Sequence, residues 1–391
     1  MHPLAFAEDQ LTNLRSKGLW RALRVLGSPQ GPRILVDGDS LLNMSSNDYL
    51  GLANDPEMRA AAKAAIDEYG AGSGAVRTIA GTMAIHEALE QEIADWKGVE
   101  ATLVLQSGFA ANLGAIASLV GRDDVILSDE LNHASIIDAC RLSRATVRRF
   151  AHADAGALRA ELQASTAYPR KLVVTDGVFS MDGDIAPLPA LVDVAEEFGA
   201  IVMVDDAHGS GVLGRGGRGT VDHFNLKGRV HVQMGTLSKA IGSMGGYLAG
   251  SHTLRDHLIH NARPFLFSTS HPPSVVGATR AAIGILSRDT TRVDRLWTNA
   301  RYFKAGLANI GLNTGRSETP ITPVIVGEAD RAHALSDRLR ELGVFVQSVT
   351  FPTVAENAAR VRVMVSAAHS QDDLDEAIQS FAQAAEDLGL N

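Results

Sequence analysis

Short apolar runs alternate with amphipathic stretches along the middle of the chain. Runs of five or six mostly apolar residues predict strands, at 101–105, 124–128, 146–150, 171–176, 201–205, 230–234 and 245–249. Stretches with helical periodicity lie between several of these runs, at 109–120, 134–142, 155–163 and 188–198. Strands that are apolar throughout are typical of parallel sheets buried on both faces. The alternation therefore predicts a doubly wound α/β domain with a mostly parallel sheet.

The two ends of the chain have other patterns. Leucines near helical spacing predict an amphipathic helix over 8–26, and two further helices are predicted at 57–68 and 84–97. From about residue 285, helices and apolar runs follow each other at 289–310, 320–326, 329–342, 344–349, 360–366 and 371–388. We therefore expect three parts: an N-terminal helix and extended segment (1–55), a large α/β domain (56–285) and a small C-terminal α+β domain (286–391).

Composition narrows the class of protein. The 391 residues are 45% apolar, which allows a large core, and their formal net charge of −9 weakly disfavours a nucleic-acid surface. Cys140 is the single cysteine, so neither an intrachain disulfide nor a thiolate metal cluster is expected. No apolar run approaches the ~20 residues of a membrane span, and residues 1–19 lack the apolar core of a signal peptide. We expect a cytoplasmic enzyme with no metal site and no membrane or nucleic-acid partner.

Loops that follow predicted strands are the candidates for chemistry, because ligands of open α/β sheets bind beyond the carboxyl ends of the strands. Gly108 and Phe109 open a helix whose N–H groups suit an anion, although an ordinary turn has the same pattern. His133 is either a structural histidine or a ligand-facing one. Asp205 is either a helix cap or a partner for a protonated ring nitrogen. Lys239 either extends to solvent or, if buried, forms a Schiff base.

One motif is typical of a different class of site, a dinucleotide-binding site. Residues 209–214 match G-x-G-x-x-G after a predicted strand, which is the dinucleotide-binding pattern. The glycine-rich residues 215–219 that follow are a poor helix, and 227–238 contain no Asp or Glu to bind a ribose. The sequence therefore disfavours a nicotinamide cofactor. Taken together, an anion cradle, a histidine, a carboxylate and a lysine at successive strand ends are the parts of a pyridoxal 5′-phosphate (PLP) site.

The residues around these loops resemble a known family. Four stretches, 128–138, 176–183, 204–209 and 235–239, are similar in order and spacing to the α-oxoamine synthases, a branch of the fold-type-I PLP-dependent transferases. The resemblance extends from the segment 43–51 to the segment 360–369. It implies a large PLP-binding domain with a mostly parallel sheet, a smaller C-terminal domain, and a homodimer whose active sites lie at the interface.

The resemblance also implies roles for single residues. Lys239 would form the Schiff base with the cofactor and remove the proton from the substrate Cα. Asp205 would pair with the pyridine nitrogen, His208 would hydrogen-bond the phenolic oxygen, and His133 would stack on the ring. The remaining cofactor and substrate contacts would come from Gly108, Phe109 and Thr236 at the phosphate, Ser180 beside the cofactor, Ser268 and Thr269 at the partner's phosphate, Arg362 at the substrate carboxylate and Asn47 in the substrate site.

The implied reaction condenses an amino acid with an acyl-CoA thioester to an α-amino ketone and releases CoA. Segments 295–301 and 360–369 look more like glycine C-acetyltransferase, so glycine and acetyl-CoA are our first expectation. Arg24 favours the alternative, an 8-amino-7-oxononanoate synthase that joins L-alanine to a pimeloyl thioester with decarboxylation, since an arginine suits the pimeloyl carboxylate. A solvated charge on an N-terminal helix is the other interpretation of Arg24. A fold-type-I aminotransferase and a PLP-binding regulator without catalysis are hypotheses from other classes.

Overall fold

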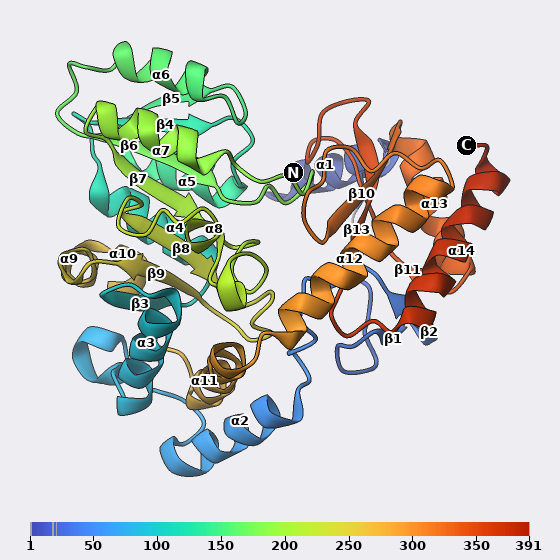
Figure 1. Cartoon of the computed structure of the whole chain (residues 1–391), viewed down its shortest axis with the longest axis horizontal. Coiled ribbons are helices and arrows are strands. Elements are labelled where there is room, and N and C mark those ends of the chain that lie inside the picture. The colour runs from blue at the N-terminus through green and yellow to red at the C-terminus, as the bar shows by residue number, and fades with distance from the viewer. Residues whose placement is uncertain (1, 18, 21, 391) are drawn as a thin grey trace.

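A seven-stranded sheet forms the centre of the large domain (Figure 1). The computed structural model describes residues 2–17, 19–20 and 22–390. The strand order is β3-β9-β8-β7-β6-β4-β5, and β4 to β8 are parallel to one another while β9 is antiparallel to both of its neighbours. The strands are β3 (Ala101–Leu105), β4 (Val125–Asp129), β5 (Thr146–Phe150), β6 (Lys171–Asp176), β7 (Ile201–Asp205), β8 (Val232–Thr236) and β9 (Gly246–Gly250). The predicted mostly parallel α/β architecture is confirmed.

Helices cover both faces of this sheet, because successive side chains of a strand point to opposite faces. Ile126 packs into a cluster with α4 and α5, whereas its neighbours Val125 and Leu127 pack with α6 and α7. One face is covered by α4 (Gly108–Leu119), α5 (Ala134–Ser143), α9 (His252–Asn261) and α10 (Arg263–Leu266). The other is covered by α6 (Ala155–Gln163), α7 (Leu188–Glu197) and α8 (Thr220–His223), and near β3 and β9 by α2 (Pro56–Tyr69), α3 (Ala84–Lys97) and α11 (Pro273–Arg288).

The small domain packs two three-stranded sheets against long helices. One sheet has the order β10-β13-β12, all antiparallel, and the other has the order β1-β2-β11. Its elements are β1 (Arg33–Val36), β2 (Asp39–Asn43), α12 (Thr291–Asn309), β10 (Ile321–Gly327), α13 (Ala329–Glu341), β11 (Val344–Phe345), β12 (Gln347–Val349), β13 (Ala359–Met364) and α14 (Gln371–Leu388). Helix α12 runs from the large domain into the small one in Figure 1.

Two predicted elements are wrong in extent. The N-terminal helix α1 covers Ala5–Ser16 instead of 8–26. Two hydrogen bonds join Val25 to Asp37: the Asp37 N–H donates to the Val25 carbonyl oxygen (2.8 Å), and the Val25 N–H donates to the Asp37 side chain at Oδ1 (3.0 Å). This part of the chain is therefore bonded across to a hairpin and not along a helix. The run 344–349 is two strands, because β11 pairs with β2 while β12 pairs with β13.

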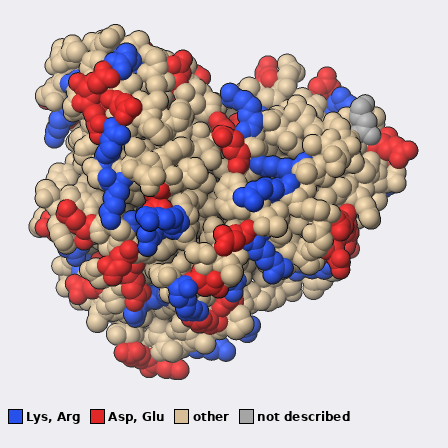
Figure 2. Space-filling view, viewed as in Figure 1, with Lys and Arg blue, Asp and Glu red and all other residues tan. Residues whose placement is uncertain are grey.

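Smaller features follow from the same packing. Strand β8 ends at Thr236, two residues later than predicted, so this threonine closes a strand instead of opening a loop. Cys140 is buried on α5, where burial raises the pKa of its thiol to about 11. Two short helical turns complete the large domain, a π-helix at Arg77–Gly81 and a 3-10 turn at Arg215–Gly217. None of the described helices is both long and apolar enough to cross a membrane. Positive and negative side chains are mixed over the face shown in Figure 2.

Candidate active site

A cavity of about 250 Å³ lies at the carboxyl ends of β6, β7 and β8, where α4 and α5 begin. Eight of the residues predicted for the cofactor line it: Gly108, Phe109, His133, Ser180, Asp205, His208, Thr236 and Lys239. These residues are up to 131 positions apart in the chain, between Gly108 and Lys239, and only the parallel strand ends bring them together.

Lys239, which is partly buried, and the buried His208 form the centre of a chain of polar contacts. Lys239 Nζ lies 2.7 Å from His208 Nε2, and His208 Nδ1 lies 2.7 Å from the hydroxyl of Tyr49. Burial lowers the pKa of Lys239 to about 8, and the nearby Asp205 carboxylate only partly offsets this. Burial, assisted by the positive charge of Lys239, also holds the pKa of His208 well below its usual range. The amine is therefore available in its neutral form near pH 8, beside an uncharged imidazole.

Asp205 ends strand β7 and is buried at the floor of the cavity. Its Oδ2 accepts a hydrogen bond from Asn112 Nδ2 (2.7 Å), and its Oδ1 accepts one from the Ala207 N–H (3.0 Å). Burial raises the pKa of Asp205, while the Asn112 hydrogen bond and the charge of Lys239 lower it. These contacts favour a carboxylate that is held in place and ready to pair with a cation.

His133 is the N-cap residue of α5. Its Nδ1 accepts a hydrogen bond from Ser135 N (3.2 Å) and lies 2.8 Å from Ser135 Oγ, and its own backbone N–H donates to Asp176 Oδ2 (3.1 Å). Ser135 Oγ in turn accepts from Asn112 Nδ2 (2.8 Å). The imidazole is therefore linked through two side chains to the Asp205 carboxylate.

The start of α4 lies at the cavity wall and has groups that suit an anion. Ser107 caps the helix by accepting a hydrogen bond from Ala110 N (3.0 Å), and Gly108 and Phe109 form the first turn at the cavity wall. A Cβ on Gly108 would lie 3.4 Å from both Cβ and Oγ1 of Thr236, so the glycine leaves space between the helix start and this hydroxyl. N–H groups of a first helical turn together with a hydroxyl suit a phosphate group.

Arg362 lies where three parts of the chain meet. It projects from β13 of the small domain, its Nε donates to the Ser180 carbonyl oxygen (2.6 Å), and its Nη1 donates to Asn47 Oδ1 (3.4 Å). Because Ser180 lines the cavity, this guanidinium lies beside the cavity without being part of its wall. Burial lowers the pKa of Arg362, and the arginine remains charged.

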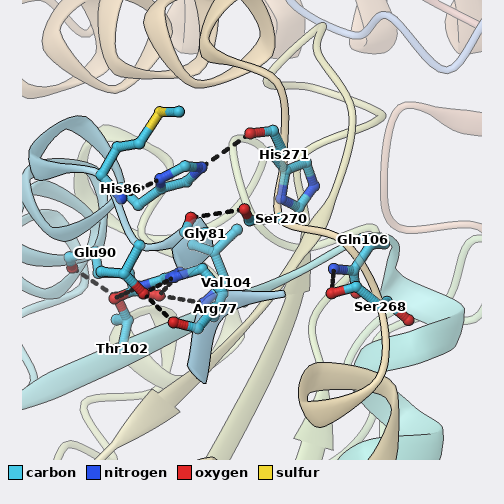
Figure 3. Close-up of polar contacts among 12 residues, drawn as sticks. Arg77, Gly81, His86, Glu90, Thr102, Val104, Gln106, Ser268, Ser270 and His271 are labelled. Carbon is cyan, nitrogen blue, oxygen red and sulfur yellow. Dashed lines mark hydrogen bonds and ion pairs between the residues drawn. The ribbon is translucent and has the colours of Figure 1, made fainter. Parts of the chain in front are cut away.

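The segment that carries Ser268 and Thr269 is tied to the same wall from outside (Figure 3). Gln106 Nε2 donates to the carbonyl oxygens of Thr269 (2.8 Å) and Ser268 (3.5 Å), two residues before Gly108. Ser270 Oγ donates to the Gly81 carbonyl (2.6 Å) at the π-helix. The side chains of Ser268 and Thr269 are not part of this cavity wall within one chain.

A buried ion pair fixes the π-helix beside that segment (Figure 3). The guanidinium of Arg77 contacts both oxygens of Glu90 at 2.8 and 3.0 Å, and Glu90 Oε1 also accepts the Val104 N–H at 2.9 Å. His86 Nε2 lies 2.9 Å from the His271 carbonyl oxygen and holds the other end of the segment. The residues 268–271 are therefore anchored to α3 and β3 and not left as a free loop.

Arg24 does not line this cavity. It is exposed and pairs with Asp37 at 3.4 Å, in the N-terminal hairpin and outside the cavity of its own chain. Three residues that were not predicted also contact the site: Tyr49, Asn112 and Asp176. Asp176 had a visible signal, since it ends an apolar run and begins a glycine-rich loop. Tyr49 and Asn112 had none, because their partners are distant in the chain.

Comparisons with known proteins agree with this geometry. Residues 39–381 match the family model described as aminotransferase class I and II. A relative from Symbiobacterium thermophilum, named 8-amino-7-oxononanoate synthase, is 57% identical over 386 residues, 98% of each chain. Serine palmitoyltransferase (SPT) from Sphingomonas wittichii has a similar solved structure, with a TM-score of 0.94 and 32% identity over 100% of this chain and 98% of the other. The chain belongs to the PLP-dependent α-oxoamine synthases.

The cofactor of this α-oxoamine synthase is PLP. A high-resolution structure of SPT with PLP superimposes with a TM-score of 0.94 at 30% identity, over 99% of this chain and 98% of that chain. The cavity fits this group, because it combines an amine with a lowered pKa, a buried carboxylate and a glycine-lined helix start. The relative's name favours the oxononanoate alternative over our first expectation of glycine and acetyl-CoA.

Proposed function

We propose that this enzyme condenses L-alanine with a pimeloyl thioester, with loss of CO2, to give 8-amino-7-oxononanoate. The observation that carries the proposal is the 57% identity, over nearly the whole of both chains, to the relative named for that product. An aminotransferase activity is a weaker candidate, supported only by the broader family description.

We assign the proton transfer at the substrate Cα to Lys239. Bound PLP supplies an electron sink for the carbanion that forms at this carbon. A pKa of about 8 leaves about a tenth of the amine neutral at pH 7 and about half at pH 8, and a general base requires this neutral form. His208 lies 2.7 Å from Nζ, so it orients the amine and is positioned to hydrogen-bond the phenolic oxygen of the cofactor.

One group of side chains and backbone N–H groups contacts the cofactor, and a second group contacts the substrate. Asp205 pairs with the ring nitrogen, and His133 stacks on the ring from the start of α5. Gly108, Phe109 and Thr236 hold the phosphate. Ser180, whose carbonyl already orients Arg362, lies beside the cofactor.

Arg362 binds the carboxylate of the amino acid. Its Nε is engaged by Ser180, which leaves the two terminal nitrogens for a bidentate contact, and Asn47 lies at one of them. We further propose a homodimer in which Ser268 and Thr269 reach the partner's phosphate, supported by the anchoring of their backbone through Gln106. Arg24 is the candidate for the pimeloyl carboxylate.

The test supplies the purified, PLP-loaded enzyme with L-alanine plus pimeloyl-CoA and, separately, with glycine plus acetyl-CoA. We expect CoA release and CO2 release with the first pair only. CoA release with glycine and acetyl-CoA alone would overturn the proposal in favour of glycine C-acetyltransferase. Exchange of an amino group with an α-keto acid, without CoA release, would instead indicate an aminotransferase.

The assignment of Lys239 has its own test. Borohydride reduction should bleach the yellow wild-type enzyme and leave a covalent adduct on the chain, detected by mass spectrometry. Lys239→Ala should show no adduct, and adduct formation at another lysine would refute the assignment.

A further inference from the structure

A second buried carboxylate lies beside Asp205. Asp176 is the last residue of β6 and is the register partner of Asp205 on the neighbouring parallel strand β7. The two residues are only 5% and 4% exposed, and both line the cavity. Neighbouring strands of a sheet lie about 4.8 Å apart, so these two side chains share one floor of the site.

The hydrogen bonds to the two carboxylates are unequal. Asp205 accepts one donor at each oxygen, from Asn112 at 2.7 Å and from the Ala207 N–H at 3.0 Å. Asp176 accepts one donor at Oδ2, the His133 N–H at 3.1 Å. Its Oδ1 is buried and has no hydrogen-bond partner among the residues that the structure describes. A carboxylate with an unpartnered buried oxygen is unfavourable, whereas a carboxylic acid places its proton on that oxygen.

The surrounding charges also favour the protonated form of Asp176. Burial and the negative charges of Asp205 and Asp129 raise the pKa of Asp176 well above its usual value, and Lys239 and the His133 N–H offset this only in part. Two carboxylates that share a buried site do not both ionise, and the one with fewer donors takes the proton.

We propose that Asp176 is a neutral carboxylic acid on the floor of the cofactor site, with its proton on Oδ1, while Asp205 alone carries the negative charge. The floor of the site then bears one negative charge, which matches the single positive charge of a protonated ring nitrogen. Oδ2 remains free to accept the His133 N–H, so the same acid also positions the stacking histidine. This inference rests on the proposed cofactor contact of Asp205.

Substitutions distinguish a neutral acid from a carboxylate. Asparagine has nearly the shape of a protonated aspartic acid, and its amide supplies both the acceptor and the donor. PLP binding to the apo-enzyme is measured by absorbance titration. We expect Asp176→Ala to weaken binding about fivefold to tenfold, because it removes the acceptor of the His133 N–H and so loosens the histidine proposed to stack on the ring. Asp176→Asn keeps an acceptor there and should bind PLP within about twofold of wild type. Asp205→Asn removes the charge and should weaken binding more than about tenfold.

Infrared spectroscopy observes the proton directly and needs no loaded enzyme. With ¹³C-carboxyl aspartate, the wild-type apo-enzyme should show the carbonyl stretch of a protonated acid, and Asp176→Asn should lack that band. The matched control is Asp124→Asn, whose carboxylate pairs with Arg170 just before β4; it should keep the band and the PLP affinity.

The outcomes separate the two proposals. If Asp176→Asn weakens PLP binding as much as Asp205→Asn, or if the wild-type band is absent, Asp176 is ionised and the inference is overturned. If Asp205→Asn binds PLP like wild type, the proposed cofactor contact of Asp205 itself fails. Absence of the band in the wild-type chain overturns the inference even if an Asp176 variant folds poorly.

Discussion

The buried ion pair between Lys97 and Asp206 gives a quantitative prediction about the loop that carries His208. Both side chains are 0% exposed, and Lys97 Nζ lies 3.1 Å from Asp206 Oδ2. Asp206 also accepts hydrogen bonds from Thr220 Oγ1 at 2.8 Å and from Thr220 N at 3.1 Å, so it joins α3 to the loop after β7. Burial opposes the charge on Lys97, but Tyr247 and Asp206 outweigh it and raise its pKa.

Lys97→Met keeps the aliphatic stem and removes the cation. The Asp206 carboxylate then stays buried without its counter-charge, and we expect the free energy of unfolding to fall by about 3–5 kcal/mol. In the double variant Lys97→Met/Asp206→Asn both charges are gone. The combined loss should therefore be smaller than the sum of the single losses by about 1–3 kcal/mol.

Urea unfolding followed by far-ultraviolet circular dichroism measures these losses, since the nearby Trp96 would distort a fluorescence signal. The matched control is Arg229→Met, which breaks an exposed pairing with Glu196 and Asp193 and should leave the unfolding midpoint nearly unchanged. A loss below about 1 kcal/mol for Lys97→Met, or strict additivity in the double variant, would refute the reasoning.

Three further predictions concern single side chains. Tyr49→Phe removes the hydroxyl group that contacts His208 Nδ1 and leaves the fold unchanged. We expect kcat to fall about tenfold and the pH at which the bound cofactor changes absorbance to shift. An absorbance–pH profile identical to that of the wild type would contradict this prediction. Arg362→Lys keeps the charge but loses the bidentate geometry, so KM for the amino acid should rise about 10–100-fold with a smaller change in kcat, as steady-state kinetics would report. His152 lies between Asp129 (3.2 Å) and Asp184 (2.8 Å), and these hydrogen bonds raise its pKa from 6.5 to about 10. Its stabilising contribution is therefore complete below about pH 6.5 and is lost as the pH rises to about 10; in urea melts, His152→Gln should flatten this slope.

The large sheet was predictable because most of its strands are buried and apolar on both faces, although the edge strand β5 is mostly exposed. The runs at 101–105, 146–150, 171–176 and 201–205 coincide with β3, β5, β6 and β7. Where the pattern weakens, the boundaries shift: β8 and β9 are antiparallel partners, and the pairing of Thr236 with Gly246 extends the strand beyond its apolar residues. The helix expected over 8–26 was too long, because leucine spacing does not reveal that Val25 has a hydrogen-bond partner elsewhere, at Asp37.

The site was predictable as far as it follows strand ends. Asp205 and Lys239 were found because each follows an apolar run, and the structure places both at one cavity. Contacts between remote segments carry no local signal: Tyr49 and His208 are 159 positions apart and still lie 2.7 Å from each other. Local motifs did not predict the substrate. Segments 295–301 and 360–369 favoured glycine and acetyl-CoA, whereas the sequence identity to the relative named 8-amino-7-oxononanoate synthase, over 98% of the chain, favours the oxononanoate activity.

The parallel pairing of β2 with β11 has a consequence for biosynthesis. Leu42 is the register partner of Val344, so one strand of this small sheet is made about 300 residues before its neighbour. At roughly 5–20 residues per second, a ribosome needs about 15–60 s to span that interval. During this time the edge of β2 that pairs with β11 has no partner strand, while the seven strands of the central sheet can already assemble. The nascent N-terminal hairpin is thus the part of this enzyme for which a chaperone has the longest opportunity to act.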